Sequence, residues 1–286
     1  MWELSSWTPD YTLDQESAPS PLVPNDRRPN IYAASGYDHR SKFRFPAAPV
    51  NLNWRQLQTR GISIDCITRL SNPGKEGETF GSKTVRWLSS LFTAQEFLQG
   101  MTKDVQNSLE ILQGIVAKYS EYHFSNDRAG LRFKSPEKNR PIKDNPILDG
   151  FINTLLLSRK GRFSYRERMT KDDLDEILSM QLLTSFSETK ESAHLDEICQ
   201  AFEEGSRWRR VLITEKGHIG SAPPTAEEGD IVCVLYGCSV PVILRKVQDQ
   251  ELYEFVGECY LHGFMDAEAI ALQIRGVLTE QEFTLV

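Results

Sequence analysis

The chain has 286 residues, of which 40% are hydrophobic and 26% charged, and its formal net charge is −7. This composition is typical of a folded protein with a sizeable core, and the acidity argues against sequence-independent binding to nucleic acid, which requires Lys and Arg. No apolar run approaches the ~20 residues that span a bilayer, and the first residues carry no signal-peptide pattern. The five cysteines are an odd number and favour a reducing compartment. We therefore expect a cytoplasmic protein without membrane association.

The first part of the chain predicts a linker and then strands. Residues 1–30 include the Pro-rich stretch SAPSPLVPNDRRPN, which is too polar to order itself by burial. Residues 31–83 hold a short strand in IYAASG and a longer one in LQTRGISIDCITRL. In the longer strand, alternation after Gly61 places Ile62 and Ile64 on one face and Ile67 on the other.

The middle of the chain, residues 84–204, has the apolar period of helices. One of these helices has Pro146 in a position that suits a first turn. Another begins with a capping signal, in which Thr170 is followed three residues later by Asp173. We therefore expect a helical region between two groups of strands.

Residues 205–286 read as a second strand group that ends in a short C-terminal helix. One hairpin is predicted to turn at residues 216–217 and another at residues 237–239. A longer strand, ELYEFVGECYLHG, precedes the helical tail DAEAIALQI. The basic cluster RWRR at 207–210 would keep a strand edge soluble, although a phosphate or acidic ligand is conceivable there.

The stretch GDIVCVLYGCSVPVILRK, residues 229–246, contains two cysteines and is apolar on both faces of its first strand. Structural zinc would require a second close pair of Cys or His, and the remaining cysteines are single. We therefore predict no metal site and no cofactor, and interpret the stretch as strands buried on both sides.

The cluster GECYLHGFMDAEA, residues 257–269, is the most enzyme-like part of the chain. Cys259 and His262 differ by three positions, so on an extended strand they point to opposite faces and do not form a dyad. The motifs of phosphate-binding loops, serine hydrolases and zinc proteases are absent from the sequence. If the chain were an enzyme, Glu258, His262 and Arg245 would be the first candidates for its polar groups.

The segment RRVLITEKGHIGSAPPTAEEGDIVCVLYGCSVPVILRK, followed by YEFVGECYLHGFMDAEA, resembles the C-terminal region of fungal heterokaryon-incompatibility (HET) domain proteins. SSWTPDYT near the N-terminus is similar to the segment that follows the HET domain in these proteins, and Ala267 stands where the family usually has Gly. The matching positions are Thr214, Gly217, Ile219, Gly220, Gly229, Asp230, Gly237, Pro241, Leu244, Arg245, Gly257, Tyr260, His262, Gly263, Met265 and Glu268.

The resemblance implies a role in nonself recognition and regulated cell death, with a HET-domain protein as a candidate partner. The HET-domain motif itself is not found, so we expect a binding or regulatory module without the effector domain, and not a catalyst. No catalytic residue is carried over, because the matching residues are of types that build turns and strands. In particular, we expect Asp230 and Arg245 to be structural, and each to be paired or exposed.

The fold class we expect is α+β. The two strand groups would combine into one small, mostly antiparallel barrel or curled sheet, with a helical insertion packed beside it, because neither group alone has enough strands to close. The alternative function is a small-molecule enzyme of a fungal secondary-metabolite pathway, with a pocket between helices and barrel.

Overall fold

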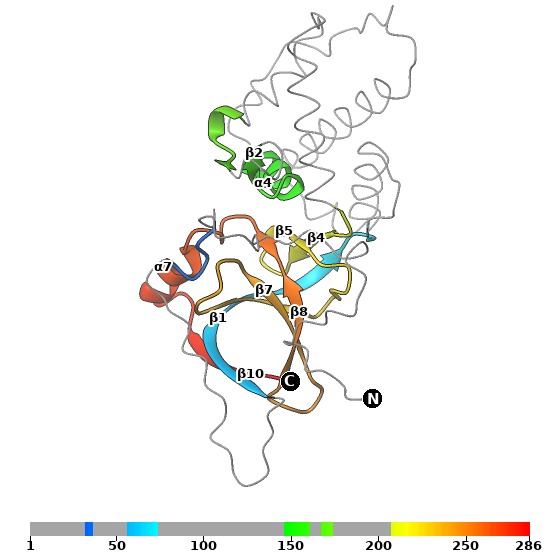
Figure 1. Cartoon of the computed structure of the whole chain (residues 1–286), viewed down its shortest axis with the longest axis vertical. Coiled ribbons are helices and arrows are strands. Elements are labelled where there is room, and N and C mark those ends of the chain that lie inside the picture. The colour runs from blue at the N-terminus through cyan, green and yellow to red at the C-terminus, as the bar shows by residue number, and fades with distance from the viewer. Residues whose placement is uncertain (1–31, 37–55, 74–145, 161–166, 174–206) are drawn as a thin grey trace, which may run out of the picture. The chain divides into compact units, whose positions relative to one another are not determined.

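The computed structural model of the chain describes residues 32–36, 56–73, 146–160, 167–173 and 207–286 (Figure 1). The protein divides into two compact units, one made of residues 1–73 and 208–286 and the other of residues 74–207. The predicted linker over residues 1–30 and most of the predicted helical region lie outside the described residues. The predicted domain boundaries therefore stay predictions.

The first unit is built on one curled sheet. In the described part of the chain, its eight strands run in the order β10-β8-β7-β6-β1-β4-β5-β9, and β10 pairs in addition with β1. This extra pairing closes five strands into a ring (Figure 1). The strands are β1 (Leu57–Leu70), β4 (Arg210–Thr214), β5 (Ile219–Ala222), β6 (Ile231–Leu235), β7 (Val242–Lys246), β8 (Tyr253–Glu258), β9 (Tyr260–Leu261) and β10 (Glu280–Leu285).

The predicted fold class is confirmed in the sheet. The described strand pairs are antiparallel except for β10 and β8, which run in parallel where Leu285 lies opposite Tyr253. β1 precedes residues 74–207 in the sequence and the other strands of this sheet follow them. The sheet therefore combines two strand groups that are far apart in the chain.

β1 is long enough to pair along both of its edges, with β10, β6 and β4 in turn. Its register shifts between Ser63 and Asp65 against β6, and again further along against β4. Such bulges add a residue on one strand and reverse the alternation of faces. Ile67 therefore joins Ile62 and Ile64 in the same core cluster, and the prediction that it would face the other way was wrong.

Both faces of β6 are buried, as predicted. Cys233 and Leu235 belong to a cluster that draws residues from all five strands of the ring, so these side chains fill its interior. Val232 and Val234 lie on the other face and pack into the main core, which includes residues of α7 (Glu268–Ile274).

Both predicted hairpins are present, as β4–β5 and β6–β7. The predicted longer strand is divided into β8 and β9 at Cys259, whose backbone N–H donates to Pro241 O at 2.9 Å. The strand predicted in IYAASG is not formed in its described part, residues 32–36. Residues 32–36 make a turn instead, and Ala33 N–H donates to Met265 O at 2.8 Å.

The last strand, β10, was missed by the sequence analysis, which ended the chain in a helical tail. After α7 the chain extends again, and Phe283 and Leu285 alternate with more exposed residues on their way through β10. Six residues of β10 lie opposite six residues of β1. Without β10 the ring would not close.

The second unit is described in two short stretches. α4 (Pro146–Leu155) begins at Pro146, as predicted, and β2 (Arg159–Lys160) pairs with β3 (Glu167–Arg168). Thr170 N–H and Oγ1–H donate to Asp173 Oδ2 at 2.8 and 2.7 Å, and Asp173 N–H donates back to Thr170 Oγ1 at 3.3 Å. The predicted capping signal is therefore confirmed. No helix in the described ranges is long and apolar enough to cross a membrane.

The end of β1 and the start of β4 are neighbours. Leu70 lies opposite Leu212, Ser71 N–H donates to Val211 O at 2.9 Å, and Val211 N–H donates to Ser71 Oγ at 2.8 Å. β1 and β4 are therefore paired as in a hairpin, although residues 74–207 separate them in the sequence.

We predict that replacing residues 74–207 by a four-residue turn yields a chain that unfolds in one cooperative thermal transition. The reason is that both strand groups, and the hairpin register between them, are retained. A matched fragment of residues 205–286 lacks β1 and is expected to show no such transition by calorimetry and no dispersed amide spectrum. Cooperative unfolding of that fragment would contradict the two-group sheet.

Candidate functional site

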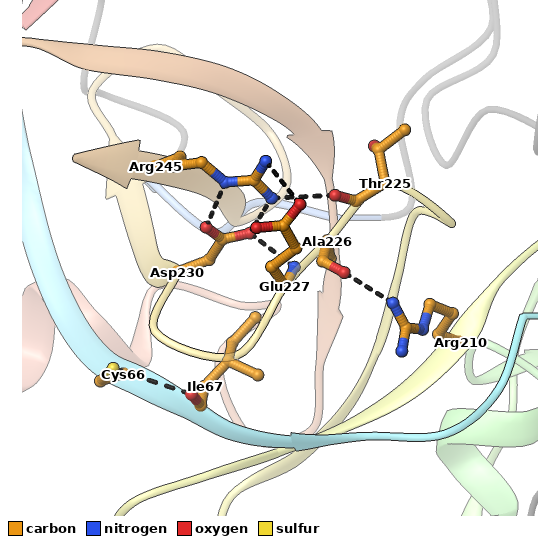
Figure 2. Close-up of polar contacts among 8 residues, drawn as sticks. All are labelled: Cys66, Ile67, Arg210, Thr225, Ala226, Glu227, Asp230 and Arg245. Carbon is orange, nitrogen blue, oxygen red and sulfur yellow. Dashed lines mark hydrogen bonds and ion pairs between the residues drawn. The ribbon is translucent and has the colours of Figure 1, made fainter. Parts of the chain in front are cut away.

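The connection between β5 and β6, residues 223–230, is held by an arginine from the neighbouring strand β7. Arg245 Nε donates to Asp230 Oδ1 at 2.8 Å and Arg245 Nη2 donates to Asp230 Oδ2 at 2.9 Å (Figure 2). The Asp230 side chain is 3% exposed, and that of Arg245 is 29% exposed. Two parallel hydrogen bonds between a guanidinium and a carboxylate fix both position and orientation. We call residues 223–230 the clamped loop.

The same guanidinium also binds the loop at two further points. Arg245 Nη2 donates to Thr225 O at 2.9 Å and Arg245 Nη1 donates to Glu227 Oε1 at 3.1 Å. Asp230 Oδ2 accepts a third hydrogen bond, from Glu227 N–H at 2.8 Å. The hydrogen bond to Asp230 is the main cause that raises the pKa of Arg245. Asp230 and Arg245 are thus paired with each other, and they shape the loop.

A second arginine holds the clamped loop from the side of β4. Arg210 Nη1 donates to Ala226 O at 2.7 Å (Figure 2). Arg210 Nε donates to Ser71 O at 2.6 Å. Its neighbour Arg209 is 1% exposed and donates through Nη1 to Glu258 O at 3.3 Å. The expectation that RWRR keeps a strand edge soluble was therefore wrong for these two arginines, because they bind backbone carbonyls within the fold.

The clamped loop is also fixed to the bulged part of β1. Ile67 N–H donates to Asp230 O at 2.8 Å, and Gly229 N–H donates to Ile67 O at 2.9 Å. Gly229 has φ +97°, a conformation that favours glycine. The loop is thereby attached to β1, β4 and β7 at once.

Gly220 marks the closest approach of two strands. A Cβ at this position would lie 2.2 Å from Tyr260 O, on the paired strand β9, so only glycine fits. Opposite Gly220 and beside Tyr260 lies Leu261, which packs in the core with Cys259. The structure thus uses this residue of the HET-like pattern for strand pairing.

The three residues that were candidates for an enzyme's polar groups have different neighbours, and Glu258 contacts its neighbour through its backbone carbonyl. Arg245 binds the clamped loop, and Glu258 O accepts from Arg209. His262 N–H donates to Ile219 O at 3.0 Å, and His262 Nδ1 lies 3.4 Å from Tyr260 Oη. Each contact joins a candidate to the sheet. Their assignment to a site stays a prediction.

The environments of the described cysteines disfavour the thiolate form. Cys259 and Cys233 are fully buried, and burial raises the pKa of both thiols. Burial also raises the pKa of Cys238 to about 11 and that of Cys66 above its usual value. A nucleophilic cysteine needs the opposite shift. Within the described ranges, no group of three or more His, Cys, Asp or Glu side chains is placed to hold a metal ion.

A polar cluster at the β4–β5 turn was not predicted from the sequence. Asp65, in β1, accepts Lys216 N–H at 2.8 Å. Burial acts to raise the pKa of Asp65, but hydrogen bonds from Thr214 and from backbone amides outweigh it and the pKa is lowered. The His218 ring meets Phe264 edge-to-face at 4.9 Å, and burial lowers the pKa of His218. The signal in the sequence that could have indicated this cluster was Asp65, an acidic residue within an alternating apolar strand.

Ala267 stands at a left-handed backbone position. It precedes α7 with φ 70° and ψ 16°, and its side chain makes no capping hydrogen bond. A residue with a Cβ costs about 1–2 kcal/mol in this conformation. The glycine that the HET proteins usually have at this position would relieve this strain.

We predict that Asp230→Ala lowers the free energy of unfolding by about 2–3 kcal/mol, because it leaves the Arg245 guanidinium without its buried partner. Glu227→Gln is the matched control. The Glu227 side chain is 67% exposed, so its loss should cost less than about 0.5 kcal/mol. Urea unfolding measures both. An unchanged stability of Asp230→Ala, with a lost binding activity, would point to a functional role for Asp230.

We also predict that Ala267→Gly raises the free energy of unfolding by about 0.5 kcal/mol. The gain from relieved strain is partly offset by the greater freedom of glycine in the unfolded chain. Ala269→Gly in α7 is the control and should lose about 1 kcal/mol, because Ala269 is fully buried within the helix. If thermal denaturation showed the same loss of stability in both variants, the claim that Ala267 is strained would be contradicted.

Comparison with known proteins shows which proteins this chain is similar to. Residues 159–285 match the family model of the Het-6 beta-barrel domain. The chain is also 29% identical over 115 residues to heterokaryon incompatibility protein 6, OR allele, of Neurospora crassa. That similarity covers 36% of this chain and 16% of the relative, so the chain spans only a small part of the relative's length. No solved structure matches.

The family match includes every strand of the ring except β1, which ends at Leu70. The matched region carries the clamped loop, both of its arginines and the close approach at Gly220. The resemblance to heterokaryon-incompatibility proteins is therefore confirmed.

Proposed function

We propose that the chain is a non-catalytic binding or regulatory module of heterokaryon incompatibility, acting in nonself recognition and regulated cell death in a filamentous fungus. The observation that carries the proposal is the use of the HET-like residues in the fold. Asp230, Arg245, Gly220 and Gly229 all serve to join strands and the clamped loop. Because these residues hold the fold together, their presence supports a protein that offers a shaped surface to a partner.

The chemistry of the described residues supports the same reading. A nucleophilic site needs an activated side chain with a base within hydrogen-bonding reach. Burial raises the thiol pKa of Cys259, and the Arg245 guanidinium is engaged by the clamped loop. These positions favour structural roles for Cys259 and Arg245 over roles in catalysis.

The partner we propose is a protein, and specifically a HET-domain protein in the cytoplasm. The relative's name connects this kind of region with heterokaryon incompatibility. The net charge of −7 makes a nucleic acid a poor partner, because phosphates would be repelled.

Expression in a fungal host tests the proposal. We expect the chain alone to leave growth and cellular NAD unchanged, and to alter the toxicity of a co-expressed HET-domain protein. Asp230→Ala should weaken that effect through instability, whereas the exposed Glu227→Gln should preserve it. Cell death or depletion of NAD caused by the chain alone would show that it is an effector, and the module would be the wrong description.

A further inference from the structure

We propose that the outer edge of β10 binds an extended, basic segment of a protein partner, which adds to the sheet as a further strand. The outer edge is the side of β10 that faces away from β1, at Glu280 and Glu282. The inference goes beyond the proposed function, because it follows from the strand pairing of β10 and is tested with peptides and not with a HET-domain protein.

The register between β10 and β1 shows which backbone groups of β10 face outward. Glu282 lies directly opposite Arg60, whose carbonyl accepts Tyr236 N–H at 2.9 Å on the β6 side of β1. Opposite residues of an antiparallel pair alternate between hydrogen-bonded and non-hydrogen-bonded pairs. Arg60 and Glu282 therefore form a non-hydrogen-bonded pair, and so do Ile62 and Glu280. The N–H and C=O groups of Glu280 and Glu282 consequently point away from β1.

The outer edge is used by another strand where one reaches it. Val286 N–H donates to Tyr253 O at 3.0 Å, at the point where Leu285 lies opposite Tyr253. The two strands run in parallel and β10 ends where β8 begins, so their pairing stops there. Among the described residues, no strand pairs with the outward groups of Glu280 and Glu282. An unpaired edge of this kind is a template for a further extended chain.

Exposed apolar side chains lie just before this edge in the chain. Ile274 and Val277 are 77% and 66% exposed, and they are the exposed large hydrophobic residues of the described part of the chain. Ile274 ends α7, and Val277 lies in the turn that leads from α7 into β10 (Figure 1). An apolar side chain of an added strand gains free energy by covering such surface. The edge therefore offers apolar contacts as well as backbone hydrogen bonds.

The charges of the edge favour a basic segment. Arg60 forms an ion pair with Glu280, while Glu282 has no ion pair within the described ranges. A Lys or Arg opposite Glu282 on the added strand would provide an attractive pair. A second copy of β10 is disfavoured, because antiparallel pairing about the middle of the edge places Glu282 opposite the copy's Glu282. The net charge of −7 adds to the preference for a basic partner.

Two short, capped and fluorescently labelled peptides provide the test, one with alternating Lys and Val and one with alternating Glu and Val. Each is titrated with the full-length chain, and fluorescence anisotropy measures binding. We expect the Lys–Val peptide to bind more tightly. Glu282→Lys should weaken its binding by about fivefold and strengthen that of the Glu–Val peptide, because the variant reverses the charge of the edge. Glu228→Lys, on the exposed part of the clamped loop, is the control with the same change in net charge and should leave both affinities nearly unchanged.

Amide hydrogen exchange followed by NMR shows where the peptide binds. The N–H groups of Glu280 and Glu282 should exchange rapidly in the free chain and become protected by the Lys–Val peptide. Phe283 N–H is the internal control, because it faces β1 and should be protected with and without peptide. Glu282→Pro removes an outward donor but no hydrogen bond to β1, so it should abolish binding while the chain still folds. Thermal unfolding checks the fold, and the charge-reversal variant decides if Glu282→Pro does not fold.

Several results would overturn the proposal. Equal affinities for the two peptides, or equal effects of Glu282→Lys and Glu228→Lys, would show that the edge does not select a basic strand. Unchanged binding by a folded Glu282→Pro variant would place the peptide elsewhere. Protection of Glu280 and Glu282 in the free chain would show that the edge is already covered, by a second copy if the protection increases with protein concentration.

Discussion

The pairing of β1 along both of its edges is the constraint on which the rest of the structure depends. One edge is bound to β6, and the other to β10 and then β4. The strand therefore connects the closed ring to the β4–β5–β9 part of the sheet. Its isoleucines enter the core from the one strand of this sheet that does not belong to the C-terminal part of the chain. The bulges in β1 let a single strand serve both parts, because they bend it and redirect its side chains.

Polar contacts fix the clamped loop on this apolar sheet. Asp230 is almost fully buried, and a buried carboxylate is tolerated only when its oxygens are satisfied. Arg245 and the Glu227 N–H donate the hydrogen bonds that satisfy these oxygens. Arg210 donates to another part of the loop, the backbone carbonyl of Ala226. Two arginines from different strands thus set the path of one connection. In this chain, the Asp and the Arg of the HET-like pattern therefore order one connection of the sheet.

Much of the C-terminal sheet could be predicted from the sequence. The two-sided apolar pattern of β6 and the glycine-containing turns are local signals, and local interactions produce the structures they indicate. The same holds in the second unit for the capping pair Thr170 and Asp173. The union of two distant strand groups could be inferred because neither could close alone.

The remaining features depend on contacts that a single sequence does not reveal. Bulges leave no mark in composition, so Ile67 was assigned to the wrong face of β1. β10 has alternating Phe283 and Leu285 among polar residues, but its identity as a strand depends on the distant edge of β1. Arg209 and Arg210 resembled surface charge because their acceptors are backbone carbonyls in other segments of the chain.

Native-state hydrogen exchange tests the central claim, that both strand groups form one cooperative unit. The amides to compare are those of Ile67 in β1 and of Tyr236, which bonds to Arg60 O on β1, with core amides of β6 and β7. The account predicts that all of them exchange with the same free energy of opening and the same dependence on denaturant, because β1 leaves only when the sheet unfolds. Exchange of the β1 amides at a clearly lower free energy, with β6 and β7 still protected, would contradict it.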